Sequence, residues 1–188
     1  MQRSIAELRG CAAEHLAHYT DPHGTRAFHV YDVDGRPDEL TPVDCLAPAL
    51  LSVPIGYRQV VPLFRPDGPG ADLRRRMQAL LEGTDGTEDF LDVELDPTCP
   101  PWGLVDAAVV AAGGVKGLKA VAVTKILHRK RPALVPIFDK AVYTFYMGTA
   151  PPTGAYQDTP RRFWPVLRDD LRNNRRWVTA LAATVTTA

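Results

Sequence analysis

One segment of the chain, residues 113–142, combines a glycine-rich turn, basic side chains and an isolated carboxylate. Asp139 is its only acidic residue, and no other Asp or Glu follows Asp106 before that position. The interval between these two aspartates holds six basic residues, namely Lys116, Lys119, Lys125, Arg129, Lys130 and Arg131. Clustered cations of this kind can bind phosphates or other anions. The segment therefore predicts an anion-binding site in which Asp139 is the candidate catalytic group.

The overall charge distribution allows two interpretations. Residues 1–110 contain 9 Lys and Arg and 18 Asp and Glu, which leaves 13 of the 22 basic and 4 of the 22 acidic residues for positions 111–188. The basic part could present one face to an anion, or the two parts could pair with each other on folding. Asp139 has a similar alternative, in which it caps a helix and pairs with Lys125 or Arg131.

Helices are predicted to position these residues. Thr41-Pro42 is a strong helix start, since Thr caps well and Pro suits the first helical position. Residues 102–112 are apolar and alanine-rich, and Gly113-Gly114 ends that helix. A basic amphipathic helix follows over 118–129, with Lys119, Lys125 and Arg129 projecting away from its apolar face. Pro136 is expected to begin the next helix, with Asp139 in its first turn.

These patterns predict an all-α fold in one domain, residues 1–188, with a helix–hairpin–helix-like element over about 102–147. At most one short strand or hairpin is expected, near residues 27–37, where strand-like residues precede a turn. No apolar run approaches the roughly 20 residues of a membrane helix, and the N-terminus does not resemble a secretory signal. We expect a cytoplasmic protein without a membrane segment.

No metal or cofactor is expected. Cys11, Cys45 and Cys99 are far apart in the sequence and have no CxxC spacing, so free thiols are the simplest interpretation. His15 and His18 could share a helix face, but no carboxylate or cysteine stands at a matching spacing.

The glycine-rich turn suggests how an anion could be held. In a helix–hairpin–helix, the unpaired N–H groups of the second helix's first turn form an anion site that the helix dipole strengthens. Lys116 and Lys119 would flank that site. A nucleic-acid phosphate is the natural ligand, and such contacts position a backbone without reading its sequence.

The same segment resembles the core of the helix–hairpin–helix base-excision DNA glycosylases. From Gly117 to Asp139 the spacing is 22 residues, similar to that family's interval between the first hairpin glycine and the catalytic aspartate. Residues 136–139, Pro-Ile-Phe-Asp, resemble the approach to that aspartate in adenine-mismatch glycosylases. The second hairpin glycine falls on Lys119, and the position of the lyase lysine falls on Val121, so a Schiff-base mechanism is not implied.

A closer resemblance is to an uncharacterised actinobacterial family. It rests on residues 124–142, with their Lys-Arg-Pro and Val-Pro-Ile-Phe-Asp elements, and on the predicted helix over 46–53. This resemblance implies a relationship over most of the chain, and it implies no activity.

The glycosylase resemblance implies a nucleic-acid-binding protein, with DNA as the partner, and a monofunctional glycosylase-like hydrolase if it is an enzyme. Asp139 would then stabilise an oxocarbenium-like sugar cation or activate water. The stacking candidates for an extruded base are Tyr143, Tyr146 and Trp164, and their alternative is a place in the core. The alternative function is an enzyme or accessory protein that binds a small anionic metabolite in a basic pocket of the same fold.

Overall fold

The computed structural model describes residues 3–21, 23, 31, 38–152 and 158–186. Every regular element within these residues is a helix, which confirms the all-α fold class. The strand or hairpin predicted near residues 27–37 lies outside the described residues, except for Tyr31. None of the described helices combines the length and apolar character that crossing a bilayer requires.

The elements follow one another along the chain as helices of varied length. The N-terminal part contains η1 (Ile5–Leu8), α1 (Ala12–Thr20), α3 (Pro42–Leu46), η2 (Ala47–Leu51), α4 (Tyr57–Val60) and η3 (Val61–Phe64), where η denotes a 3-10 helix. The rest of the chain contains α5 (Gly68–Glu82), α6 (Trp102–Ala112), α7 (Ala120–Lys130), α8 (Lys140–Met147), α9 (Asp158–Asn173) and α10 (Arg175–Thr186).

Local signals fixed some helix boundaries. Thr41 caps α3 as predicted, because its hydroxyl accepts from the amide of Asp44 while the Asp44 carboxylate accepts from the Thr41 amide. The predicted helix over 102–112 is α6, with the same bounds. The predicted start of the next helix, at Pro136, was about one turn too early. Pro136 lies outside any helix, and Asp139, with an extended backbone, is the N-cap of α8.

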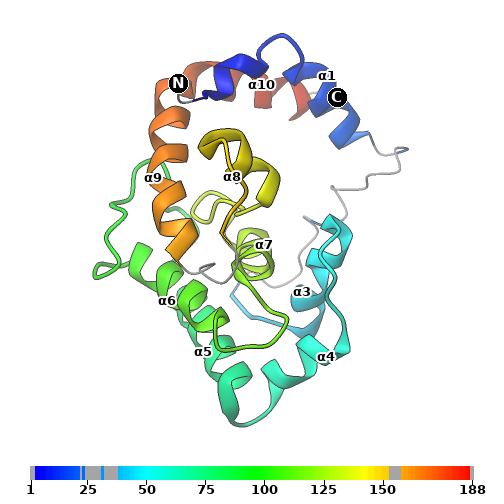
Figure 1. Ribbon diagram of the computed structural model, residues 1–188, viewed down its shortest axis with the longest axis vertical. Coiled ribbons are helices and arrows are strands. Elements are labelled where there is room, and N and C mark those ends of the chain that lie inside the picture. Colours follow the sequence, from blue (N-terminus) through cyan, green and yellow to red (C-terminus); the bar gives the residue numbers. More distant parts are fainter. Residues whose placement is uncertain (1–2, 22, 24–30, 32–37, 153–157, 187–188) are drawn as a thin grey trace.

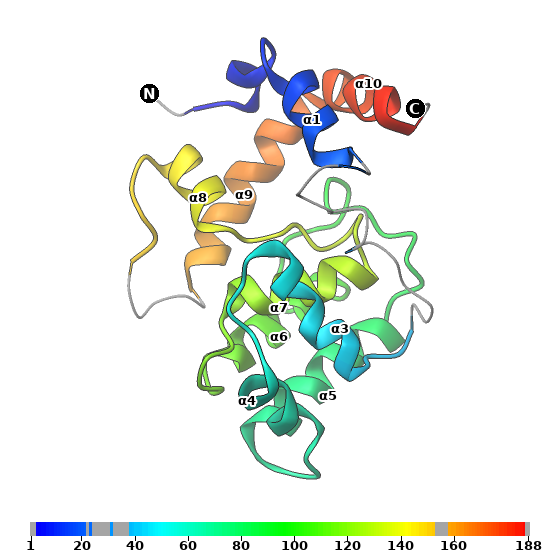
Figure 2. The same ribbon diagram turned by 90° about the vertical axis from the view of Figure 1, so that its right-hand side faces the viewer.

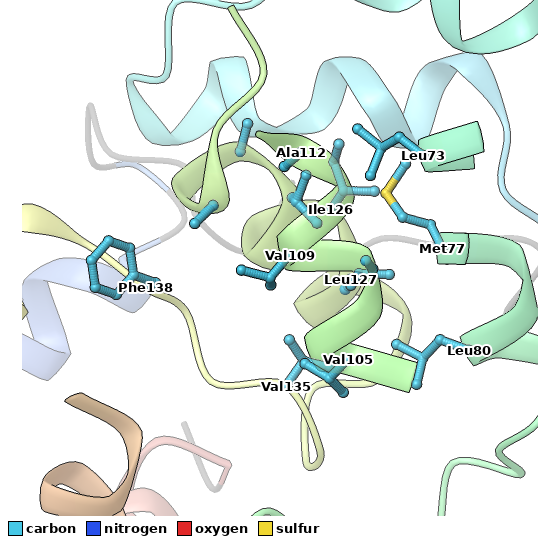
Figure 3. Close-up of a cluster of buried hydrophobic side chains, with 14 of the residues drawn as sticks. Leu73, Met77, Leu80, Val105, Val109, Ala112, Ile126, Leu127, Val135 and Phe138 are labelled. Atoms are coloured by element: carbon cyan, nitrogen blue, oxygen red, sulfur yellow. The ribbon is translucent and has the colours of Figure 1, made fainter. Parts of the chain in front are cut away.

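The core forms where α5, α6 and α7 pack together (Figure 3). Leu73, Met77 and Leu80 extend from α5 toward Val105 and Val109 of α6. Apolar residues at these spacings lie on one face of each helix, so the helices bury them against one another. From α7 come Ile126 and Leu127, and from the following segment Val135 and Phe138.

Helix α7 lies at the centre of the molecule in Figure 1. Eight of its residues are buried, on all sides of the helix rather than along one stripe: Ala120, Ala122, Val123, Thr124, Lys125, Ile126, Leu127 and Lys130. The expectation that Lys125 projects away from the core was therefore wrong. The cause is that α6, α3 and η2 all pack on α7, and a single helix's sequence pattern does not reveal a covering on its polar side.

The N- and C-terminal helices occupy one end of the molecule, where α1 and α10 lie side by side (Figures 1 and 2). The Asp170 carboxylate of α9 connects this end to the rest. It accepts hydrogen bonds from the Ser4 hydroxyl, from the Ile5 amide at 2.6 Å and from the Tyr146 hydroxyl at 2.8 Å. One carboxylate thus joins the N-terminal segment, α8 and α9.

Candidate functional site

The chain between α6 and α7 makes a short turn over residues 113–119 with one left-handed residue, Gly117, at φ +82°. A Cβ at that position would also lie 2.9 Å from the Gln59 side-chain nitrogen, so only glycine fits without adjustment. Leu118 is fully buried and anchors the turn in the core. The turn is therefore held from inside by one apolar side chain.

The exposed part of this turn carries Lys116 and Lys119. Lys119 is the N-cap of α7, with an extended backbone at φ −121° and ψ 172° and no capping hydrogen bond from its side chain. The first backbone hydrogen bond of the helix is donated by Ala122 to the Lys119 carbonyl, at 2.9 Å. Two exposed cations thus stand at the positive end of the α7 dipole.

The other end of α7 holds cations that point inward. The Asp44 carboxylate receives Arg129 Nε at 3.3 Å and Lys130 Nζ at 3.1 Å, and the Lys130 side chain is 0% exposed. The Thr41 amide and hydroxyl also donate to Asp44, at 2.8 and 2.6 Å. Burial by itself raises the pKa of Asp44, but the hydrogen bonds from Thr41 and Lys130 outweigh it and hold that pKa below the usual value.

Arg131 is buried and serves the end of α5. Its guanidinium donates to the Leu81 carbonyl at 2.7 Å, to the Thr84 carbonyl at 3.0 Å and to the Thr84 hydroxyl at 2.8 Å. It also forms an ion pair with Asp38 at 2.8 Å. Because the last carbonyls of a helix lack intrahelical partners, Arg131 acts as a C-terminal cap supplied from another element.

Asp139 combines a helix cap with an ion pair. Its Oδ1 accepts from the Ala141 amide at 2.8 Å, and its Oδ2 lies 3.4 Å from Lys125 Nζ. Lys125 also donates to the Leu51 carbonyl at 3.2 Å. The Asp139 side chain remains 35% exposed, whereas that of Lys125 is 7% exposed. These contacts are those of the alternative interpretation, a capping carboxylate paired with Lys125.

The segment before Asp139 is held against α7, which explains why α8 starts late. The Phe138 amide donates to the Thr124 hydroxyl at 3.1 Å, and the Phe138 ring is fully buried. This contact keeps the chain extended through Asp139, so helical geometry begins only at Lys140. The position of the carboxylate is therefore set by α7 and by the core.

The aromatic residues proposed to stack on a base are all in the core. Tyr143 and Tyr146 pack against Phe163 with ring centroids 5.9 Å apart in each case, and Trp164 packs edge-on against Trp102 at 4.9 Å. Burial, followed by the hydrogen bond to Asp170, raises the pKa of Tyr146. Their structural alternative, a place in the core, is the arrangement present here, because α8 and α9 pack together around these rings.

The structure therefore separates the six basic residues of the segment. Lys116 and Lys119 lie at the exposed turn, whereas the other members have largely buried side chains that pair with carboxylates: Lys125, Arg129, Lys130 and Arg131. The expectation of one shared basic surface is corrected in this respect. Asp38 and Asp44 come from the acidic N-terminal part. The acidic and basic parts of the chain therefore form ion pairs with each other at the C-terminal end of α7.

A further basic region was not recognised in the sequence. An open pocket of about 890 Å³ lies where α9 passes into α10, and several arginines line it. Residues 172–177, Arg-Asn-Asn-Arg-Arg-Trp, were the available signal. Among the described residues, no group of three or more His, Cys, Asp or Glu side chains is arranged to hold a metal ion.

Together, the fold and the exposed turn define an all-helical protein in which a central helix carries cations of two kinds. The chain belongs to a family of unknown function (DUF6308), whose model matches residues 12–188. That range includes both segments, 46–53 and 124–142, on which the resemblance to an uncharacterised family rested, and membership of such a family is confirmed. No curated protein and no solved structure matches the chain.

Proposed function

We propose that this protein binds nucleic-acid phosphates through the turn between α6 and α7, with Lys116 and Lys119 as the contacting cations. The observation that carries this proposal is that both lysines are exposed, one on each side of the left-handed Gly117. Helix α7 begins directly after Lys119, so its dipole favours an anion at the same place. Contacts of this type position a backbone and carry no sequence information.

The backbone at Lys119 is compatible with the resemblance to the glycosylase hairpin. Glycine stands there in that family, but in this chain the residue has a negative φ, which any amino acid adopts. A lysine can therefore replace the second glycine without strain and add a cation where the phosphate would lie. Gly117, at the first glycine position, keeps the positive φ that favours glycine. DNA is accordingly the polymer we propose.

A small anionic metabolite bound among the same cations has less support. Lys125, Lys130 and Arg131 are buried, and each is already within ion-pair distance of an aspartate. An anion entering among them would have to displace these carboxylates. The exposed pair at the turn suits an extended ligand that stays outside the protein, as a nucleic-acid backbone does.

For Asp139 we propose a positioning role as the cap of α8. The cap and the ion pair with Lys125 involve both carboxylate oxygens, and the aromatic rings expected beside a reacting base are buried. Base excision is the enzymatic extension of the proposal, and it would use the exposed part of this same carboxylate. Release of a base from lesion-containing duplexes by the unaltered protein, lost in Asp139→Asn, would establish that extension.

Binding is tested by fluorescence anisotropy with labelled duplex DNA, single-stranded DNA and RNA of equal length, over a series of salt concentrations. Binding weakens as salt rises, so the slope of log K against log[salt] is negative. We expect its magnitude to decrease by roughly one for each of Lys116→Ala and Lys119→Ala. Lys140→Ala is the matched control, since Lys140 is also an exposed lysine beside a helix start. If all three variants bind as tightly as the unaltered protein, the turn between α6 and α7 is not the nucleic-acid-binding site.

A further inference from the structure

The pocket between α9 and α10 has a lining that is strongly basic. Of its ten lining residues four are arginines, Arg9, Arg172, Arg175 and Arg176, and none is acidic. Arg9 comes from the N-terminal segment and the others from the junction of α9 and α10, at the end of the molecule where α1 and α10 lie together (Figure 2). Charges from both ends of the chain therefore converge on one volume.

The arginines differ in how far the protein itself uses them. Arg175 pairs with Asp92 at 3.0 Å and with Asp89 at 3.5 Å, so its charge is neutralised locally. Arg172 donates from Nε to the Leu91 carbonyl at 2.6 Å, so its two terminal nitrogens can face a ligand. Arg176 is exposed and makes no hydrogen bond or ion pair within the described residues. Arg172 and Arg176 thus offer guanidinium groups to a ligand.

An aromatic side chain and small residues complete the lining. Trp177 is partly exposed, and the guanidinium of Arg9 lies 5.3 Å from the centre of its ring. Thr179, Ala180 and Ala183 leave room along the next turns of α10. A volume of about 890 Å³ lies within the range of sites for small organic ligands. The pocket therefore combines phosphate-binding groups with an aromatic ring, one face of which already carries the Arg9 guanidinium.

The frame around the pocket is fixed by buried polar contacts. Asn174 is buried, accepts from Arg9 at 3.1 Å and donates to the Asp170 carbonyl at 2.9 Å. Asp170 is the acidic residue nearest in sequence to the pocket arginines of α9 and α10. Its carboxylate already accepts hydrogen bonds from Ser4, Ile5 and Tyr146. A site whose supporting residues are held in this way needs little reorganisation when a ligand binds.

We propose that this pocket binds a nucleoside phosphate, with its phosphates on Arg172 and Arg176 and its base against Trp177. Guanidinium groups bind phosphate oxygens in pairs of parallel hydrogen bonds, and a base stacks well on an aromatic ring. This inference does not rest on the proposed hairpin function, because it concerns different residues on different helices.

The test uses ADP as the probe, with pyrophosphate and adenosine as its separate halves, measured by calorimetry and by tryptophan fluorescence. Trp102 and Trp164 are buried, so quenching by ADP reports on Trp177. We expect ADP to bind more tightly than either half, and Arg176→Ala to weaken ADP binding about tenfold. Arg176→Lys should restore only part of the affinity, because an ammonium cannot form the paired hydrogen bonds.

Two controls keep the outcome specific. Arg162→Ala removes another exposed arginine of α9, distant from the pocket, and should leave ADP affinity unchanged. Trp177→Phe should abolish the quenching and leave most of the heat of binding. The proposal is overturned if ADP does not bind, if pyrophosphate binds as tightly as ADP, or if a single-stranded oligonucleotide displaces ADP and binds far more tightly. Lys116→Ala should not affect ADP binding, so the two proposals fail independently.

Discussion

The two ends of α7 carry the same kind of side chain in opposite settings. At its start, Lys116 and Lys119 are exposed beside a glycine turn. At its end, Lys130 and Arg131 are buried and held by Asp44 and Asp38. Cations at both ends were equally good candidates for phosphate binding in the sequence. The difference shows that burial and a carboxylate from a distant segment decide whether a basic residue supports the fold or faces a ligand.

A consequence is that substitutions at the two ends should change different properties. Removing a charge inside the protein leaves its partner buried and unpaired, which costs folding free energy. Removing an exposed lysine changes the surface potential and hardly affects folding. The two ends of α7 should therefore differ first in their effect on stability and then in their effect on ligand binding.

The largest effect is expected for Asp44→Asn. This change keeps the size of the side chain and removes the charge that Arg129 and Lys130 share. We expect the free energy of unfolding to fall by about 3 to 5 kcal/mol, as for other broken buried ion pairs, in urea denaturation. Asp72→Asn is the control, since its pairs with Arg75 and Arg76 are exposed to solvent, which screens them, and its loss should be much smaller. Similar losses of unfolding free energy for both variants would contradict the distinction between buried, structural ion pairs and exposed ones.

The unfolding free energies of the unaltered protein and of Asp44→Asn should become more similar in acid. The folded-state pKa of Asp44 is lowered from the usual 3.8, so the ionised carboxylate stabilises the fold above that pH, and this contribution is lost as the pH falls through the lower folded value. The difference in unfolding free energy between the unaltered protein and Asp44→Asn should therefore be constant near neutrality and shrink below pH 3.8. A difference that grows in acid would mean that Asp44 is not the charged partner.

Arg131→Lys should produce a loss of about 2 to 3 kcal/mol, because a lysine cannot reach the Leu81 and Thr84 carbonyls together with Asp38. Denaturant titration measures this loss. If the guanidinium contributes only its charge, the lysine variant will instead be as stable as the unaltered protein.

Asp139 allows its two contacts to be separated. Asp139→Asn keeps a side chain that caps helices well and removes the charge near Lys125, and we expect a loss of about 1 kcal/mol at this partly exposed position. Asp139→Ala removes the cap as well and should cost about 1 kcal/mol more. Equal stabilities for the two variants would show that the hydrogen bond to Ala141 contributes nothing.

Local parts of the fold were predictable because their causes are local. The Thr41-Pro42 start and the glycine stop after residue 112 follow from capping chemistry and backbone preference. The cap at Asp139 and its pairing with Lys125 were among the alternatives, since both partners lie within one segment.

The division of the cations was not predictable, since it depends on distant residues. Nothing near Lys130 in the sequence indicates that Asp44 will cover it, 86 positions away. The arginine pocket has the same origin, because Arg9 meets Arg172 and Arg176 only after α1 packs on α10. Such contacts follow from how the helices pack rather than from their own periodicity.

The smallest effect on stability is expected at the turn. Lys116→Ala and Lys119→Ala combined should change the unfolding free energy by no more than about 0.5 kcal/mol, as for other surface substitutions. Both residues are exposed, and the turn itself is held by Gly117 and Leu118. A large loss of stability in the double variant would place these lysines with the structural cations.

The most direct test of the account is the salt dependence of DNA binding by this same double variant. The slope of log K against log[salt] should be smaller by about two than that of the unaltered protein, while its unfolding curve stays the same. If the double variant binds DNA with an unchanged slope, the exposed end of α7 is not the phosphate-binding site.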